Sequence, residues 1–270
     1  MDTPKVDYQM AYKQLLDEKA GLEKQNQLLE KQNQIKDKLF HMIGHDLRSP
    51  LGSIKMILDF LNQENADEES LDLKSMLPEL SDAADEAFYL LENLLYWTRI
   101  QTNRISYKPG EIPVQQLINK AVLNMKRSFE QKGITIIQEI EGNQEVFGDE
   151  YLLLVILRNL LSNACKFSNR GTPVSIRLSE SAGHLTIHLS DQGVGIKAED
   201  MEKIRDPYSL FSTYGTNNEN GNGLGLKVCQ ALAAINKGEL RIDTQPGTGT
   251  IVRLLLPAGD DSCPHQGKKN

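Results

Sequence analysis

Residues 158–168 read Arg158-Asn-Leu-Leu-Ser-Asn163-Ala-Cys-Lys166-Phe-Ser168 and carry the strongest structural signal in the chain. They continue an aliphatic run at helical spacing, so residues 151–165 are predicted to form a helix. The apolar stripe facing the core is Leu153, Leu157, Leu160, Leu161 and Ala164. Asn159 and Asn163 are four residues apart and share the opposite face. An amide oxygen there suits Mg²⁺, and Lys166 returns to that face as a point charge for phosphate.

A glycine-containing motif, Asp191-Gln-Gly193-Val-Gly195-Ile196, ends residues 184–191, whose alternating apolar residues predict a strand. Because the two glycines lack a Cβ, the backbone there can approach a planar base or a phosphate closely. A carboxylate only accepts hydrogen bonds, so Asp191 suits the amine of adenine. By itself the motif is also typical of an ordinary turn at a strand end.

A second glycine-rich stretch, Asn220-Gly221-Asn-Gly223-Leu224-Gly225-Leu226, opens a predicted helix at residues 225–235. Such a loop presents backbone N–H groups and the positive end of the helix dipole to phosphate. Between the two motifs lie roughly 25 polar residues, a length typical of a functional lid. A last glycine pair, Gly247-Thr-Gly249-Thr250, is interpreted as a hairpin turn.

The residues that follow Pro109-Gly110 predict one mixed domain, assigned to residues 107–258. Helices are expected at residues 113–129, 151–165 and 225–235. Strands are expected at residues 134–140, 174–178, 184–191, 240–243 and 250–256. Helices mixed with mostly hairpin-linked strands indicate an α+β sandwich, in which helices cover one face of a single sheet.

The N-terminal part has a different, wholly helical pattern. Residues 1–37 contain a heptad repeat with Leu22 and Leu29 seven apart, which predicts a coiled-coil linker or, equally, a frayed solvated helix. Residues 38–106 contain two apolar stripes separated by a polar loop at residues 62–70, which predicts a helical hairpin. The stripe of its first helix is Phe40, Ile43, Leu47, Leu51, Ile54, Leu58 and Leu61. A lone hairpin buries too little apolar surface, so a four-helix bundle formed by a homodimer is expected.

The first helix of the hairpin carries a histidine that points away from its stripe. His45 is two residues from both Ile43 and Leu47, about 200° around the helix from each, so its ring is predicted to face solvent. Asp46 follows it and can hold one ring N–H while the other nitrogen acts as a nucleophile. Pro50 is expected to bend the helix, because it lacks the N–H that would bond to Asp46.

Composition limits the classes of function. A net charge of −7 argues against a general nucleic-acid binder, and no apolar run reaches the roughly 20 residues needed to cross a bilayer. No signal peptide opens the chain, and Cys165, Cys229 and Cys263 fit no disulfide framework, so a reducing, cytoplasmic location is expected. Residues 259–270 are predicted to be a disordered tail, and a sensor domain can precede Met1 in a longer protein.

The order and spacing of these motifs resemble a known family. An asparagine helix, D-x-G-x-G, a polar lid and G-x-G-L-G-L resemble the Bergerat-type ATP-binding fold of histidine kinases, gyrase, MutL and a heat-shock chaperone family. The segment His45-Asp46-Leu-Arg-Ser49-Pro50-Leu resembles the H-box of sensor histidine kinases. In hydrolysing relatives a glutamate activates water at the position of Asn159, and an amide cannot act as that base. The combined resemblance covers residues 38–257.

The resemblance implies a protein histidine kinase that uses ATP and Mg²⁺. His45 would accept the phosphoryl group with help from Asp46 and Asn159, and Asn163 would bind the metal. The implied nucleotide-binding residues are Asn159, Asn163, Lys166, Phe167, Asp191, Gly193, Gly195, Ile196, Gly221, Gly223, Leu224, Gly225, Leu226 and Thr250. The family also implies a homodimer and transfer of phosphate to an aspartate of a response-regulator receiver domain in trans.

Three hypotheses remain open from the sequence. The first is an ATP-dependent histidine autokinase, the second an ATPase or serine kinase of the same fold, and the third a nucleotide-holding adaptor without turnover. In relatives that also dephosphorylate their partner, Thr or Asn often stands four residues after the histidine. Ser49 stands there in this chain, which leaves phosphatase activity undecided.

Overall fold

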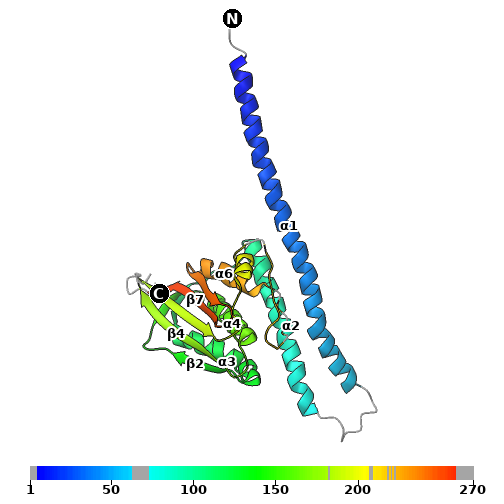
Figure 1. Ribbon diagram of the computed structural model, residues 1–270, viewed down its shortest axis with the longest axis vertical. Coiled ribbons are helices and arrows are strands. Elements are labelled where there is room, and N and C mark those ends of the chain that lie inside the picture. The colour runs from blue at the N-terminus through cyan, green and yellow to red at the C-terminus, as the bar shows by residue number, and fades with distance from the viewer. Residues whose placement is uncertain are drawn as a thin grey trace, which may run out of the picture.

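The helical part of the chain consists of α1 (Lys5–Leu61) and α2 (Leu73–Gln101), which packs against the C-terminal half of α1 (Figure 1). The computed structural model describes residues 5–62, 73–181, 183–206, 209–217, 219, 221 and 223–259. The predicted loop after Asn62 and the predicted tail beyond Gly259, with Cys263, lie outside the described residues. The predicted linker and first hairpin helix are one continuous helix, which runs through Pro50. Within the described residues, no helix is both long and apolar enough to cross a membrane.

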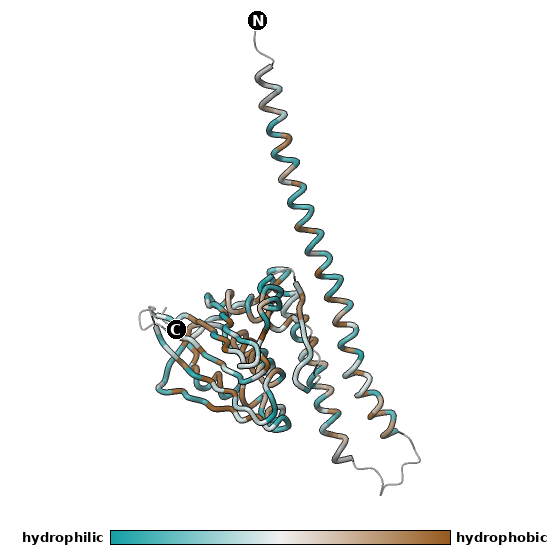
Figure 2. Tube along the Cα trace, in the orientation of Figure 1, coloured by the Kyte–Doolittle hydropathy of each residue, from teal (hydrophilic) through white to brown (hydrophobic). Residues whose placement is uncertain are grey.

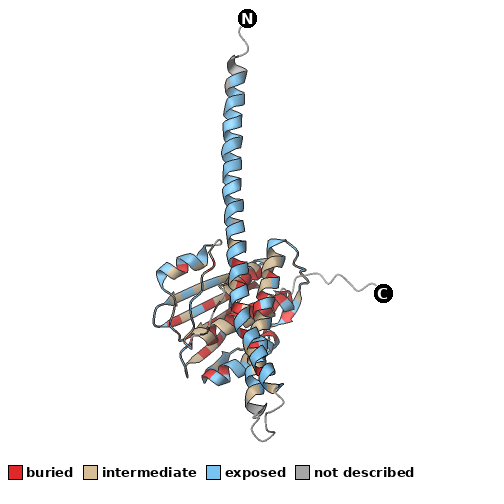
Figure 3. Ribbon diagram, turned by 90° about the vertical axis from the view of Figure 1, so that its right-hand side faces the viewer, coloured by how far each residue is buried: buried red, intermediate tan, exposed pale blue. Residues whose placement is uncertain are grey.

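The N-terminal half of α1 extends away from the rest of the molecule and is exposed along its length (Figure 3). Leu22 and Leu29, the apolar residues of the heptad repeat, are 55% and 50% exposed. The structure contains a single chain, so the pairing of this seam stays a prediction.

Only part of the predicted apolar stripe of α1 is buried. Ile43 is 4% exposed, whereas Phe40 and Leu51 are about half exposed. The stripe is too wide for one neighbouring helix to cover, so α2 and the C-terminal domain bury one edge of it. The residues of α1 that are actually buried there are Leu39, Ile43, Pro50 and Ile57, together with Asp46.

The C-terminal domain is built on a five-stranded sheet with the strand order β2-β4-β5-β7-β6. These strands are β2 (Thr135–Glu139), β4 (Pro173–Ser181), β5 (His184–Asp191), β6 (Glu239–Gln245) and β7 (Gly249–Pro257). The pair β2 and β4 is parallel, and the other pairs are antiparallel. A separate antiparallel pair is formed by β1 (Gly110–Pro113) and β3 (Glu145–Gly148). Hydrophobic residues concentrate inside this domain (Figure 2).

Three helices, α3 (Val114–Lys132), α4 (Glu150–Phe167) and α6 (Gly225–Ile235), lie between the sheet and α2 (Figure 1). This confirms the predicted α+β sandwich with helices on one face. The short elements β1, β3 and α5 (Ala198–Arg205) were not predicted. The two strands have four residues each, and α5 lies inside the polar stretch interpreted as a lid. Cys165 and Cys229 are both buried.

The C-terminal domain packs directly against the helical hairpin. Leu210 and Leu224, from the segment between β5 and α6, are buried against Leu39 and Ile43 of α1. Polar contacts with α2 add to this interface, among them ion pairs of Arg158 with Glu92 and of Arg127 with Asp82. In this arrangement, the glycine-rich motif before α6 is thus held beside α1, the helix that carries His45.

Candidate functional site

Helix α4 begins at a well-defined cap, which sets the position of the asparagine motif. The Oδ1 atom of Asp149 accepts hydrogen bonds from the backbone N–H groups of Tyr151 and Leu152, both at 3.1 Å. Its Oδ2 atom accepts from the N–H of Lys108 at 2.7 Å. Because the first N–H groups of a helix have no partner within it, this side chain stabilises the start of α4.

The predicted site residues meet at a cavity of about 1380 Å³. It is bounded by α4, the end of β5, α6 and the segment before α6, and it extends to α2. The predicted residues that line it are Asn163, Lys166, Phe167, Asp191, Gly195, Ile196, Gly221, Gly223, Gly225, Leu226 and Thr250. The structure therefore brings together residues of all four motifs, while their roles as nucleotide ligands stay predictions.

Asn159 is buried and does not line the cavity with Asn163, so its contact with nucleotide stays a prediction. Its side chain is fully buried: Oδ1 accepts from the hydroxyl of Tyr89 at 2.6 Å, and Nδ2 donates to the carbonyl of Val155 at 2.9 Å. The reason is that α2 covers this side of α4. A Cβ added at Gly225 would lie 2.7 Å from the same Oδ1, so α6 closes over Asn159 as well.

Two other predicted residues lie beside the cavity rather than in its lining. A Cβ added at Gly193 would overlap the backbone carbonyl of Phe167, 2.7 Å from its carbon atom, so Gly193 serves the contact between the end of β5 and the end of α4. Leu224 is fully buried against α1. Both are packing positions in this arrangement, and a sequence motif does not separate packing glycines from ligand-binding ones.

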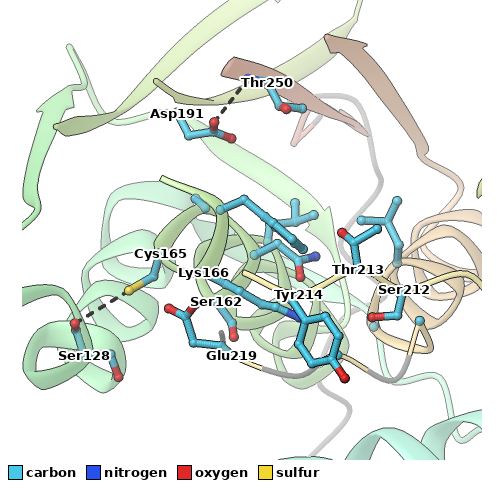
Figure 4. Close-up of a pocket in the computed structure, with 18 of the residues that line it drawn as sticks. Ser128, Ser162, Cys165, Lys166, Asp191, Ser212, Thr213, Tyr214, Glu219 and Thr250 are labelled. Atoms are coloured by element: carbon cyan, nitrogen blue, oxygen red, sulfur yellow. Dashed lines mark hydrogen bonds between the residues drawn. The ribbon is translucent and has the colours of Figure 1, made fainter. Parts of the chain in front are cut away.

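Asp191 faces the cavity with its carboxylate held by backbone groups. The Oδ1 atom accepts from the N–H of Thr250 at 3.2 Å (Figure 4). It also accepts from the N–H of Gly193 at 2.9 Å. Burial raises the pKa of Asp191 above its ordinary value, and these two hydrogen bonds oppose that rise. Oδ1 is thereby engaged with the protein, and the carboxylate offers Oδ2 as an acceptor for a base amine.

Lys166 lies on the other side of the cavity from Asp191 (Figure 4). Its Nζ atom is 4.9 Å from the centre of the Phe167 ring, and burial lowers the pKa of Lys166 to about 8. Lys132 and Glu219 also line the cavity and were missed in the sequence; Lys132 donates to the backbone carbonyl of Lys166 and to Glu219. Lys132 stands in the last turn of a helix before Gly133, where a lysine is commonplace, so no local signal marks it.

His45 occupies the outer surface of α1, as predicted. Its side chain is 70% exposed, and Nδ1 lies 3.2 Å from Oδ1 of Asp46, whose side chain is 7% exposed. Among the described residues, Ser49 lines the cavity and His45 does not. His45 instead borders a separate surface depression with His41 and Met42. Ser49 follows His45 by one helical turn, so in this arrangement the cavity ends about one turn away from the histidine.

The donor set at the cavity fits a cation that is held mainly by a bound phosphate. In the described part of the chain, no group of three or more His, Cys, Asp or Glu residues could hold a metal ion by itself. Mg²⁺ commonly keeps several waters and binds through one or two protein ligands plus substrate phosphates. The amide oxygen of Asn163, in the cavity wall, is consistent with such a single contribution.

Comparison with known proteins gives the class of the domain. Residues 148–260 match the family described as histidine kinase-, DNA gyrase B-, and HSP90-like ATPase. The C-terminal domain is therefore similar to this ATPase family over those residues.

The chain as a whole is homologous to sensor histidine kinases. It is 27% identical over 232 residues to the sensor-like histidine kinase SenX3 of Mycobacterium tuberculosis, covering 84% of this chain and 56% of SenX3. It is 26% identical over 239 residues to the sensor histidine kinase RcsC of Escherichia coli, covering 88% of this chain and 25% of RcsC. The chain thus spans about half of one relative and a quarter of the other.

Two solved histidine kinases share the fold. The Acinetobacter baumannii kinase AdeS superposes with a TM-score of 0.57 at 19% identity, covering 80% of this chain and 98% of that one. Full-length ShkA, solved in complex with AMPPNP, superposes with a TM-score of 0.58 at 20% identity, covering 84% of this chain and 47% of that one. At these identities the likeness concerns the fold alone.

Proposed function

We propose that this chain is an ATP-dependent protein histidine kinase that phosphorylates His45 and then passes the phosphoryl group to an aspartate of a response-regulator receiver domain. The observation that carries the proposal is the pairing of an exposed imidazole with a buried carboxylate, 3.2 Å apart, on a helix packed against a domain similar to the ATPase family. The homology to sensor histidine kinases supports it. Such a reaction would take place in the cytoplasm, where ATP is available.

The contact with Asp46 assigns the roles of the two ring nitrogens. Asp46 accepts the hydrogen bond of Nδ1–H, which leaves Nε2 with a free lone pair pointing outward. Nε2 would attack the γ-phosphorus in line, forming an N–P bond while the bond to the β,γ-bridging oxygen breaks and ADP leaves. The Asp46 carboxylate would stabilise the positive charge that develops on the ring.

The cavity supplies binding rather than acid–base chemistry. Asp191 would accept from the amine of adenine, and the Lys166 ammonium would face the phosphates. Mg²⁺, with Asn163 as one ligand, would neutralise phosphate charge when bound. The buried amide of Asn159 cannot remove a proton from water, which favours transfer to a side chain over hydrolysis.

Transfer requires the C-terminal domain to leave the position seen in the structure. The cavity reaches Ser49 of α1, whereas His45, one helical turn earlier, does not line it. The large apolar side chains exposed on the hairpin support a homodimer, in which the domain of one chain could reach a histidine of either chain. They include Phe40, Leu51 and Leu58 of α1 and Phe88, Leu91 and Leu95 of α2.

The test is incubation of the chain with γ-³²P-labelled ATP and Mg²⁺. Label on His45 should be lost in acid, because a phosphoramidate is acid-labile, and His45→Gln should abolish labelling while ATP still binds. The matched control is His41→Gln, one helical turn away on the same exposed surface, which should label like the parent. Acid-stable label would refute the proposal, as would label that persists in His45→Gln.

A further inference from the structure

The segment before α6 encloses the side chain of Lys166. A Cβ added at Gly215 would lie 2.5 Å from Cγ of Lys166, and one added at Gly221 would overlap its Nζ. The lysine therefore runs between two glycines, and its ammonium ends beside the first glycine of the motif before α6. Neither position accepts a side chain without displacing Lys166.

This segment is fastened to the end of α4 by its own backbone. The N–H of Thr216 donates to the carbonyl of Lys166 at 3.1 Å, and its hydroxyl donates to the carbonyl of Ser168 at 2.7 Å. The turn is closed by Glu219, whose carbonyl accepts from the N–H of Gly215 at 2.8 Å and whose Oε2 accepts from the N–H of Asn217 at 2.7 Å. Glu219 is thus the residue on which the turn closes.

A buried lysine connects this turn to α4. Lys132 is 3% exposed, and its Nζ donates to the carbonyls of Cys165 and Lys166 at 2.8 and 2.7 Å and to Oε1 of Glu219 at 2.7 Å. The last carbonyls of a helix lack partners within it and favour a cation, which explains why the ammonium is stable there. A buried ammonium also requires its counter-charge, so Lys132 fixes the position of Glu219.

We propose that Lys132 and Glu219 are positioning residues for Lys166: their ion pair holds the turn around Lys166, so that its ammonium stays at Gly221 to meet the nucleotide phosphates. The inference rests on the proposed function in one respect, that Lys166 contacts phosphate. Neither Lys132 nor the carboxylate of Glu219 needs to touch the nucleotide. Their contribution is to order the turn before binding, which lowers the entropic cost of binding.

The first variant is Glu219→Gln, made in the full chain. It keeps the shape of the side chain but replaces a charge-assisted hydrogen bond with a neutral one, so ATP should bind roughly fivefold more weakly by calorimetric titration. The rate of labelling at saturating ATP should be unchanged, so the variant should raise KM for ATP and leave kcat as it is. The melting temperature without nucleotide should fall as well, because the buried Lys132 ammonium loses its counter-charge, so the double-mutant cycle is needed to separate positioning from this loss of stability. The matched control is Glu202→Gln on exposed α5, which should bind like the parent.

A double-mutant cycle with Lys166→Met distinguishes positioning from a general structural effect. If Glu219 acts through Lys166, Glu219→Gln should weaken binding in the parent and should have no further effect when Lys166 is methionine. An equal loss in both backgrounds would overturn the inference, and so would unchanged or tighter binding in Glu219→Gln. Because binding is measured separately, a chain that binds ATP but never labels His45 refutes the proposed function alone. A labelled chain in which the cycle shows no coupling refutes only the positioning role.

Discussion

The contact between Tyr89 and Asn159 predicts that the docked position of the C-terminal domain limits the proposed phosphoryl transfer to His45. The Tyr89 hydroxyl of α2 donates at 2.6 Å to a fully buried amide oxygen of α4. Burial raises the pKa of Tyr89 to about 12, so the hydroxyl remains a neutral donor at any physiological pH. Tyr89→Phe removes this oxygen and little else.

The size of the effect follows from the burial of both partners. A net hydrogen bond contributes about 1 kcal/mol, and a buried acceptor left without a donor costs about 1–3 kcal/mol. When the domain leaves α2, water can take the place of the Tyr89 hydroxyl at Asn159. Losing that hydroxyl therefore destabilises mainly the docked state. We expect docking to weaken by about 1–2 kcal/mol, which is a 5–30-fold shift in the ratio of docked to released domains.

The assay is the initial rate of acid-labile labelling at saturating ATP. Tyr89→Phe should raise this rate severalfold, at most by the 5–30-fold shift in the ratio of docked to released domains, and should leave the Kd for ATP unchanged. Tyr107→Phe is the matched control, because the Tyr107 hydroxyl is buried and has no hydrogen-bond partner among the described residues, so its removal should leave the rate unchanged. A rate in Tyr89→Phe that is equal to or lower than that of the parent would show that this contact does not restrain the domain.

Two further predictions concern the cavity. In Gly193→Ala, the new Cβ meets the backbone carbonyl of Phe167, so the free energy of unfolding should fall by about 1–3 kcal/mol in thermal denaturation. The control is Gly110→Ala, whose Cβ meets no atom within 4 Å and which should leave the free energy of unfolding nearly unchanged. An unchanged melting temperature in Gly193→Ala would contradict the close approach described above. ATP affinity should also fall as pH rises through about 8, because burial lowers the pKa of the Lys166 ammonium, which is proposed to face phosphate. The positive charge of Lys132 lowers this pKa further, and the carboxylates of Glu219, Asp46 and Glu86 raise it. Lys166→Met should bind weakly and lose this alkaline fall in a titration from pH 7 to 9, and a parallel fall in both proteins would assign it to another group.

Features that depend on local geometry could be predicted from the sequence. The spacing of apolar residues along α4 and the alternation along β5 indicated the elements and the face each turns to the core. The outward direction of His45 followed from its two-residue offset from Ile43 and Leu47 on a helix, and the structure confirms that its ring is exposed. The glycine motifs were singled out because backbone without a Cβ can approach a base or a phosphate closely, and at Gly193 and Gly225 the structure shows a close approach to other protein atoms.

The position of one element relative to another was decided only by the tertiary structure. Asn159 and Asn163 share a helix face by periodicity, but α2 covers one of them, and the Tyr89–Asn159 contact joins residues 70 positions apart. Lys132 and Glu219 are 87 positions apart, and each is an unremarkable charged residue in its own segment. Such pairings depend on how separate elements pack, which no local pattern encodes. For the same reason, the sequence identified His45 and the glycine and asparagine motifs, while only the packed structure shows that Ser49 lines the cavity and His45 does not.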